Sequence, residues 1–329
     1  YEEKREIIMA KKKGQAQVQL TGVQHKKTLG KQIKSRWQIY LLLVVPIVYL
    51  IIFAYVPMGG LVIAFKDYNF RDGVFGSPWV GFDNFIEFFQ GRHFPIVIPN
   101  TIIIAIYSLV VTFPIPIIFA LMLNAMRGRR YKKIIQTITY IPHFFSVIVM
   151  VGLLYQIINY RTGLYGALYS MITGHLPKDI LATGSNFYHL YVWSAVWQST
   201  GYNAIIYIAA LAGVDQELHE AATIDGASRF QRVLYIDFPS ILPTASIMLI
   251  LAIGNVMNIG FDKAFAMQNS LNLNYSEIIS TYVYKVGLAS GITDFSLSTA
   301  IGMFNSVINF SLLVIANWGS KKLSGSGIF

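Results

Sequence analysis

The sequence predicts an all-α membrane protein with six transmembrane helices. Hydrophobic residues make up 54% of the 329 residues, only 13% are charged, and the mean hydropathy is +0.51. A chain this apolar is unlike a soluble globule, so its nonpolar side chains are expected to face lipid. A helix needs about 20 apolar residues to cross a bilayer. Six segments mostly free of charge meet that requirement: 39–65, 96–125, 134–158, 187–213, 243–267 and 295–318.

The positions of lysine and arginine orient these spans. Residues 1–38 hold ten of them and the segment 127–133 holds five, whereas the three loops on the other side of the membrane carry fewer. Short cytosolic loops carry the excess of basic residues, so the N-terminus, the loop 214–242 and the C-terminal tail are expected in the cytosol. We therefore predict a multi-pass protein of the cell membrane with both termini cytoplasmic.

The chain divides into a basic tail, residues 1–38, and a transmembrane domain, residues 39–329. The tail is polar and rich in lysine, and we expect disorder or a loose surface helix. Met9 precedes an alanine and three lysines, so residues 1–8 are interpreted as an extension. Much of the net charge of +10 belongs to this tail, which favours anionic membrane lipid over nucleic acid as the partner.

Catalytic and nucleotide-binding patterns are missing from the sequence. Its six histidines show no H-E-x-x-H spacing, and it has no G-x-S-x-G elbow, no phosphate-binding loop and no cysteine. We expect no catalytic residue, metal site or cofactor in this chain. A secondary transporter or channel and a membrane-embedded enzyme are the alternatives, but the spans before Asp262 hold almost no ionisable residues for proton or sodium coupling.

The polar segment 214–242 separates the fourth and fifth spans. The run from Glu220 to Ile224 favours a helix, and Gly226 can supply the left-handed conformation that ends it. Ser228 can cap a second short helix that ends before Pro239. The segment should therefore protrude from the membrane as two short helices joined by a turn.

The first of these helices carries side chains suited to docking. Ala221 and Ala222 are small enough to let a partner approach closely. Glu220 offers a charge to a partner arginine, and Asp225 can satisfy backbone donors near the turn.

The spacing E-A-A-x3-G, followed by I-x-F-P, resembles the signature loop of the permease subunits of binding-protein-dependent ABC importers. One departure is Phe238, which stands where that family usually has leucine. In the family this loop inserts into a cleft on a cytosolic ATPase subunit, and ATP and Mg bind to that partner. The coupling residues that the resemblance implies here are Glu220, Ala221, Ala222, Asp225, Gly226 and Pro239.

Further short motifs resemble the carbohydrate branch of the same family, associated with oligosaccharides and polysaccharide fragments. They include the segments 79–85, 260–262 and 282–287. The resemblance implies the type I ABC importer permease fold, which is maltose-transporter-like. It also implies four kinds of partner: a second homologous permease or, less favoured, a second copy of this chain; two ATPase subunits; an external solute-binding protein; and a carbohydrate substrate.

Polar and aromatic side chains in the last three spans are the candidate substrate pathway. Burying such groups in a membrane is costly unless they pair or face a cavity. They are Trp193, Trp197, Gln198, Tyr202, Asn203, Asn255, Asn258, Asn305 and Asn309. Aromatic faces stack on the C–H surfaces of sugars, while amides bind hydroxyl groups. The alternative is that these residues form aromatic belts and hydrogen bonds between helices, and the sequence leaves both open.

Overall fold

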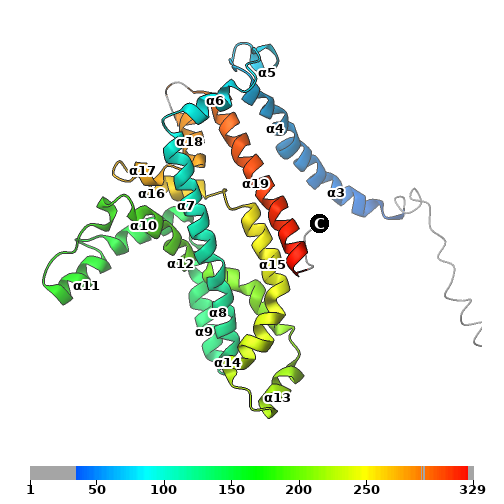
Figure 1. Cartoon of the computed structure of the whole chain (residues 1–329), viewed down its shortest axis with the longest axis vertical. Helices are drawn as coiled ribbons and strands as arrows, with labels where there is room; N and C mark the ends of the chain where they lie inside the picture. The colour runs from blue at the N-terminus through cyan, green and yellow to red at the C-terminus, as the bar shows by residue number, and fades with distance from the viewer. Residues whose placement is uncertain (1–34, 290, 292, 325–329) are drawn as a thin grey trace, which may run out of the picture. The chain divides into compact units, whose positions relative to one another are not determined.

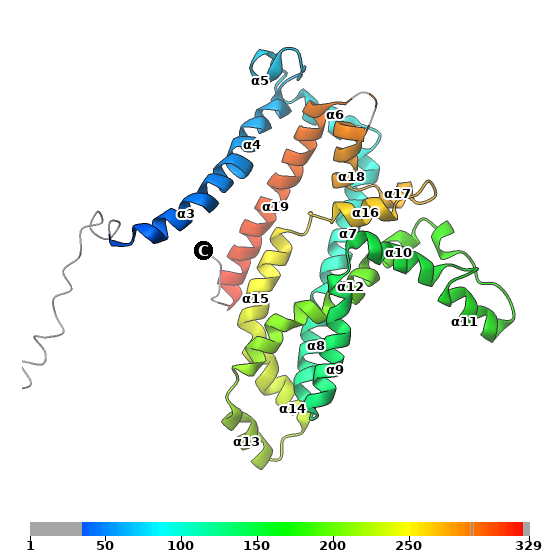
Figure 2. The same ribbon diagram turned by 180° about the vertical axis from the view of Figure 1, so that it is seen from behind.

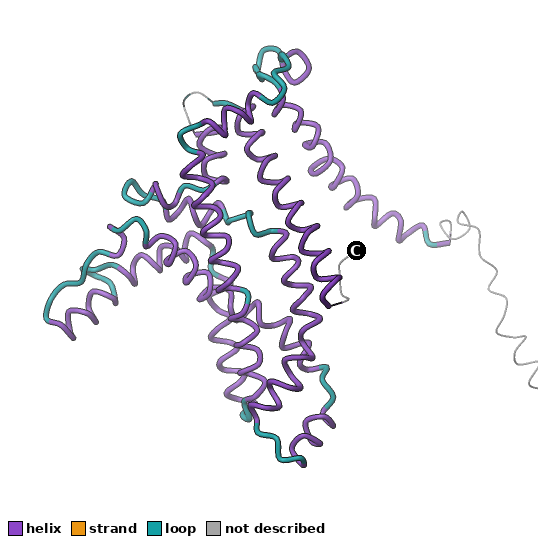
Figure 3. The backbone as a smooth tube through the Cα atoms, viewed as in Figure 1, coloured by secondary structure: helices purple, strands orange, loops and turns teal. Residues whose placement is uncertain are grey.

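The computed structural model describes residues 35–289, 291 and 293–324. The predicted basic tail lies outside the described residues up to residue 34. Within the described chain, helices alternate with turns and loops, and the only strand-like pairing is an isolated bridge between Lys66 and Trp79 (Figure 3). The all-helical prediction is therefore confirmed for these residues. The chain divides into a first unit, residues 1–60, and a second unit, residues 61–329.

The first unit contains one apolar helical stretch. It runs through α3 (Trp37–Leu50), the π-helical turn η1 (Ile51–Tyr55) and α4 (Val56–Met58). None of these three elements contains a buried residue. A helix that is apolar on all sides and buries nothing within its own unit is stable where lipid or another membrane helix surrounds it.

The second unit is built from long helices linked by short ones. The long helices are α7 (Phe94–Thr112), α8 (Pro114–Ala125), α9 (Arg129–Tyr140), α10 (Val147–Ile158), α12 (Asn186–Ala212), α15 (Phe238–Gly254) and α19 (Phe295–Ser324). The short elements are η2 (Gly59–Phe65), α5 (Gly73–Gly76), α6 (Asp83–Gln90), η3 (Ile141–Phe144), α11 (Leu164–Thr173), η4 (Ile180–Ala182), α13 (Gln216–Ile224), α14 (Arg229–Arg232), η5 (Val233–Asp237), α16 (Phe261–Met267), α17 (Leu273–Ser276), α18 (Ile279–Tyr284) and η6 (Lys285–Ala289).

Four continuous helical stretches in the described chain are long and apolar enough to cross a membrane. They are Trp37–Phe65, Phe94–Ala125, Arg229–Gly254 and Phe295–Gly319. A fifth is possible if α9 with η3 and α10, which meet at a bend of 108°, together form one span. The helix α12 occupies the predicted fourth span and is 27 residues long, but it is too polar to meet the same test. Six spans thus remain a prediction.

The predicted late bound of the fifth span, 243–267, is wrong, and the helix that holds this span also starts earlier than residue 243. The helix starts at Arg229 and ends at Gly254, and residues 258–260 are in an irregular segment before α16. At the early end, the basic residues before Phe238 belong to the same continuous helix, although their charge suggested a separate loop. At the late end, asparagine side chains and a glycine interrupt the apolar run, and both residue types favour turns over helix.

The helix α12 lies at the centre of the second unit and contacts α7, α8, α9 and α15. The helices α15 and α19 pack side by side, as both views show (Figures 1 and 2). One apolar cluster joins α8, α12 and α15 through Ile117, Ala204 and Ile241. The close approach of α9 to α12 depends on Gly201, because a Cβ atom there would collide with the backbone carbonyl of Thr139.

Candidate functional site

The predicted docking segment begins with a capped helix. The Asp215 carboxylate accepts a hydrogen bond of 3.0 Å from the backbone N–H of Glu217 and so caps α13. The helix ends at Ile224, and Gly226 adopts φ +80, the left-handed conformation that the sequence predicts. No residue of α13 is buried. In Figure 1 this helix lies at the end of the second unit far from α6 and α18.

The second helix of the segment starts with a capping box. The Ser228 hydroxyl accepts from the backbone N–H of Gln231 at 3.3 Å, and the Gln231 carbonyl oxygen accepts from the backbone N–H of Ser228 at 2.7 Å. The prediction that this helix ends before Pro239 is wrong. It continues through the π-helical turn η5 into α15, and Pro239 lies just after this turn, where the hydrogen-bond pattern of the helix changes.

The turn between the two helices is closed by the backbone. The N–H of Ala227 donates to the carbonyl of Ala222 at 2.8 Å. In the described chain the Asp225 carboxylate accepts no hydrogen bond, so its predicted contact with backbone donors is not formed. Glu220, Ala221 and Asp225 are exposed. The segment therefore presents a fixed backbone with its signature side chains available for contact.

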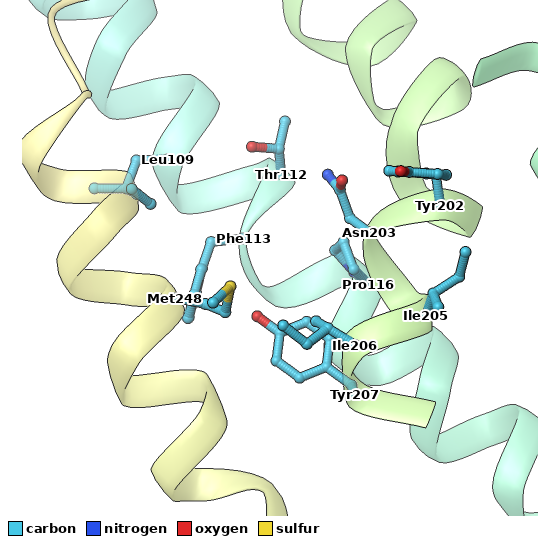
Figure 4. Close-up of a pocket in the computed structure, with 11 residues that line it drawn as sticks. Leu109, Thr112, Phe113, Pro116, Tyr202, Asn203, Ile205, Ile206, Tyr207 and Met248 are labelled. Carbon is cyan, nitrogen blue, oxygen red and sulfur yellow. The ribbon is translucent and has the colours of Figure 1, made fainter. Parts of the chain in front are cut away.

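An open cavity of about 600 Å³ lies between α7, α8, α12 and α15 (Figure 4). Its lining residues are Leu109, Thr112, Phe113, Pro116, Tyr202, Asn203, Ile205, Ile206, Tyr207, Met248 and Ala252. Most are apolar, and a few hydroxyl and amide groups stand among them. A surface of this composition can contact a ligand that has both nonpolar faces and hydroxyl groups.

Two of the predicted pathway residues, Tyr202 and Asn203, line this cavity. The Tyr202 ring stacks on His143, with ring centroids 3.7 Å apart and planes within 4°. Because His143 belongs to η3, at the bend between α9 and α10, the stack fixes one wall of the cavity against that bend. Gln198 supports the same bend, since its amide donates to the carbonyl of Phe145 at 3.2 Å.

The other aromatic residues of the predicted pathway lie on α12 outside the cavity lining. Trp193 and Trp197 are 53% and 43% exposed in this chain. The Trp193 indole donates to the Tyr107 hydroxyl at 3.0 Å. Their exposure leaves both interpretations of these tryptophans open.

The four predicted asparagines meet in one hydrogen-bonded network. The Asn258 carbonyl oxygen accepts from Asn309 at 3.0 Å and from Asn305 at 3.2 Å, and the Asn258 amide donates to Asn255 at 2.5 Å. The Asn309 carbonyl oxygen accepts from the backbone N–H of Met257 at 3.1 Å. None of the four lines the cavity of Figure 4. The network joins α19 to the segment after α15, which favours the structural interpretation of these residues.

Sequence reasoning missed a polar contact beneath the docking segment. Asp237, only 2% exposed, lies 3.2 Å from the His219 ring nitrogen Nε2 and accepts from the Asn124 amide at 3.1 Å. The sequence did offer one indication of this contact, since Asp237 is an acidic residue within the apolar run around Pro239. Thr112, Pro116 and Met248 of the cavity lining were missed as well, and no pattern in the sequence marks them.

Known proteins resemble this chain in sequence and in structure over most of its length. Protein LplB of Bacillus subtilis is 41% identical over 90% of this chain and 92% of its own length. The polygalacturonan/rhamnogalacturonan transport system permease protein YteP of the same organism is 37% identical over 92% of this chain and 94% of its own length. The crystal structure of a bacterial ABC transporter that imports the acidic polysaccharide alginate contains a chain that matches with a TM-score of 0.82 and 33% identity, over 91% of this chain and all of that one.

The family model described as "Binding-protein-dependent transport system inner membrane component" matches residues 112–325. That match includes the docking segment and every lining residue of the cavity except Leu109. The chain therefore belongs to the family of binding-protein-dependent transport system inner membrane components, as a multi-pass permease of the carbohydrate type that carries no cofactor and leaves ATP hydrolysis to partner subunits.

Proposed function

We propose that this permease imports an oligosaccharide or a fragment of a polysaccharide, delivered by an external solute-binding protein. The names of its relatives support this substrate class, since they refer to polygalacturonan, alginate and arabinooligosaccharides. The polar and apolar lining of the cavity in Figure 4 is compatible with a sugar, which has hydroxyl groups and C–H faces.

The membrane arrangement that we propose has six spans and cytosolic termini. It counts α12 as a span and the bent pair of α9 and α10 as another. A polar helix can cross a membrane when its polar groups face protein, and α12 packs against α7, α8, α9 and α15 on part of its surface. The basic segment 127–133 and the docking segment 214–242 then lie on the same, cytosolic side.

Two ATPase subunits dock on this permease and on a second, homologous permease that pairs with it. The observation that carries this step is the capped, exposed helix α13. It buries no residue within its own chain, yet it is capped by Asp215 and ended by the left-handed Gly226. Ile224 is 87% exposed at its end. An apolar side chain held outward on a fixed helix fits a cleft on a partner protein.

Detergent extraction of the native complex tests this proposal. The tagged chain is purified with and without the substitution Glu220→Lys, and the proteins that accompany it are identified by mass. We expect an ATPase subunit and a second permease with the unmodified chain, and loss of the ATPase from the variant, because reversal of the charge repels a partner arginine. A charge reversal at Asp72, an exposed acid outside the docking segment, is the control.

Retention of the ATPase by both Glu220→Lys and the control would contradict docking through α13. Purification of the chain alone, under conditions that preserve other membrane complexes, would contradict the proposed assembly as a whole. Substrate class is tested separately, by measuring ATP hydrolysis of the reconstituted complex with oligosaccharides of neutral and acidic sugars. Stimulation by none of them would contradict the carbohydrate substrate.

A further inference from the structure

A carboxylate is buried where the docking segment enters the membrane. Asp237 is the last residue of the π-helical turn η5, directly before α15, and is 2% exposed. An ionised carboxylate loses its hydration when it is buried, and it is stable there only with hydrogen-bond donors or an opposite charge beside it. The contacts of Asp237 therefore identify what it holds together.

Side chains from two other elements, α13 and α8, contact one oxygen atom of this carboxylate. Its Oδ1 lies 3.2 Å from Nε2 of His219, on α13, and accepts a hydrogen bond of 3.1 Å from the amide of Asn124, at the end of α8. The backbone carbonyl of Asn124 accepts in turn from the Lys132 ammonium group, on α9, at 3.0 Å. A movement of α13 thus acts directly on Asp237, and through it on α8 and α15.

Apolar packing does not fix α13, because none of its residues is buried. In the described chain, one ion-pair contact and one side-chain hydrogen bond join α13 to other elements. One is the contact of His219 with Asp237. The other is the hydrogen bond of 2.6 Å from the guanidinium group of Arg232 to the Thr223 hydroxyl. Arg232 belongs to α14, the short helix beside α13, so His219 makes the direct contact with the residue that immediately precedes α15.

The surrounding charges make this carboxylate hard to replace. Asp237 and His219 line a polar cavity of about 500 Å³, which is also lined by Arg127, Lys132, Arg229 and Arg232. Asp237 is the only acid among the described residues of that lining. Loss of its negative charge leaves four cationic side chains facing the cavity, and like charges at such distances repel.

We propose that His219 and Asp237 are positioning residues that form a joint between the docking helix α13 and the spans α8 and α15. The joint transmits the displacement of α13, produced when the ATPase subunits close, to the membrane helices. This inference rests on the proposed docking of ATPase subunits on α13. The short contact between His219 and Asp237 suits this role, because it fixes the distance between α13 and the start of α15 where little apolar packing does so.

Reconstitution of the complete transporter in proteoliposomes tests the joint. The complex contains both permeases, the ATPase subunits and the binding protein, and the measured quantity is substrate transported per ATP hydrolysed. We expect His219→Leu and Asp237→Asn to lower this ratio by about tenfold, a typical magnitude for coupling between two sites, while the ATPase subunits stay bound. His219→Gln should restore much of the ratio, because its side-chain amide can donate to the Asp237 carboxylate.

The control is His175→Leu, at an exposed histidine outside the docking segment, which should keep the original ratio. An unchanged ratio in both His219→Leu and Asp237→Asn would overturn the joint, and docking would still stand if Glu220→Lys releases the ATPase. Equal loss in His219→Leu and His219→Gln would also overturn it. That result would show that the imidazole ring of His219 matters for its shape and not for its polar contact with Asp237. Absence of the ATPase from the unmodified complex would overturn docking and the joint together. Should Asp237→Asn fail to assemble, the two His219 variants decide.

Discussion

The docking segment and the membrane cavity differ in how their geometry is specified. In the docking segment, Asp215, Gly226 and Ser228 each act on backbone groups within three residues or fix their own φ angle. In the cavity, Asn203 and Met248 face the same space from helices that come together only in the folded chain (Figure 4). The first region is therefore specified locally and the second by tertiary packing.

This difference affects what a substitution does in each region. A change at a local backbone signal alters the shape of the whole docking segment, because no apolar packing of α13 compensates for it. A change in the cavity alters one patch of lining, while the clusters of α7, α8, α12 and α15 keep the helices in place. We expect the docking segment to be sensitive to conformation and the cavity to be sensitive to side-chain chemistry.

The largest effect is expected from Gly226→Pro. Gly226 has φ +80, whereas proline locks φ near about −65°, so the turn cannot form as it stands. The ATPase would then meet a misdirected α13, and uptake of substrate should fall by roughly tenfold or more, as for a lost coupling between sites. Uptake by cells is the measurement, with the amount of the chain in the membrane determined in parallel and expected to be unchanged.

The matched control at this position is Gly226→Asn. A Cβ atom at residue 226 meets no other atom within 4 Å, so only the backbone angle is at issue. Asparagine tolerates the left-handed region better than other non-glycine residues, and this variant should retain most of the uptake. Equal loss in both variants would show that the side chain rather than the φ angle matters, and would break the distinction between the two regions.

The same distinction explains how much could be predicted from the sequence. The left-handed Gly226 after the end of α13 and the cap at Ser228 are confirmed, because both depend on residue types that act within one turn of the chain. The partners of Asp237 could not be predicted. Its contact with Asn124 spans 113 residues, and nothing near either residue indicates that their helices meet.

The span boundaries fail for a related reason. Charged residues upstream of Pro239 suggested a loop. Instead, a capping box starts a helix at Arg229, and the π-helical turn η5 links this start to α15 without a break. Similarly, the polar residues of α12 marked it as unusual, but only the packing of α7, α8, α9 and α15 around it explains how it accommodates them. Asn203 could be chosen by residue type, whereas its place in the cavity depends on that packing.

A smaller effect is expected from Asn203→Leu, which tests the chemistry of the cavity. Leucine has a similar size but cannot bind a hydroxyl group. Loss of one hydrogen bond costs about 0.5–1.5 kcal/mol, or roughly 2- to 12-fold in affinity. The substrate concentration that half-stimulates ATP hydrolysis should rise by that factor in the reconstituted complex, with the ratio of substrate to ATP unchanged. A changed ratio with an unchanged concentration dependence would instead assign Asn203 to coupling.

The smallest effect on transport is expected from Asn258→Leu, the same substitution made outside the cavity. Asn258 accepts hydrogen bonds from Asn305 and Asn309 of α19 and donates one to Asn255. Leucine therefore removes two contacts with α19 and one within the segment after α15. Hydrogen bonds between membrane helices average about 0.6 kcal/mol each, and the free energy of unfolding should therefore fall by about 1–2 kcal/mol. Thermal unfolding in detergent should detect that loss, while the half-stimulating substrate concentration stays the same. The reverse result, normal unfolding with weakened substrate dependence, would place the asparagines in the pathway and show that the cavity of Figure 4 is only part of it.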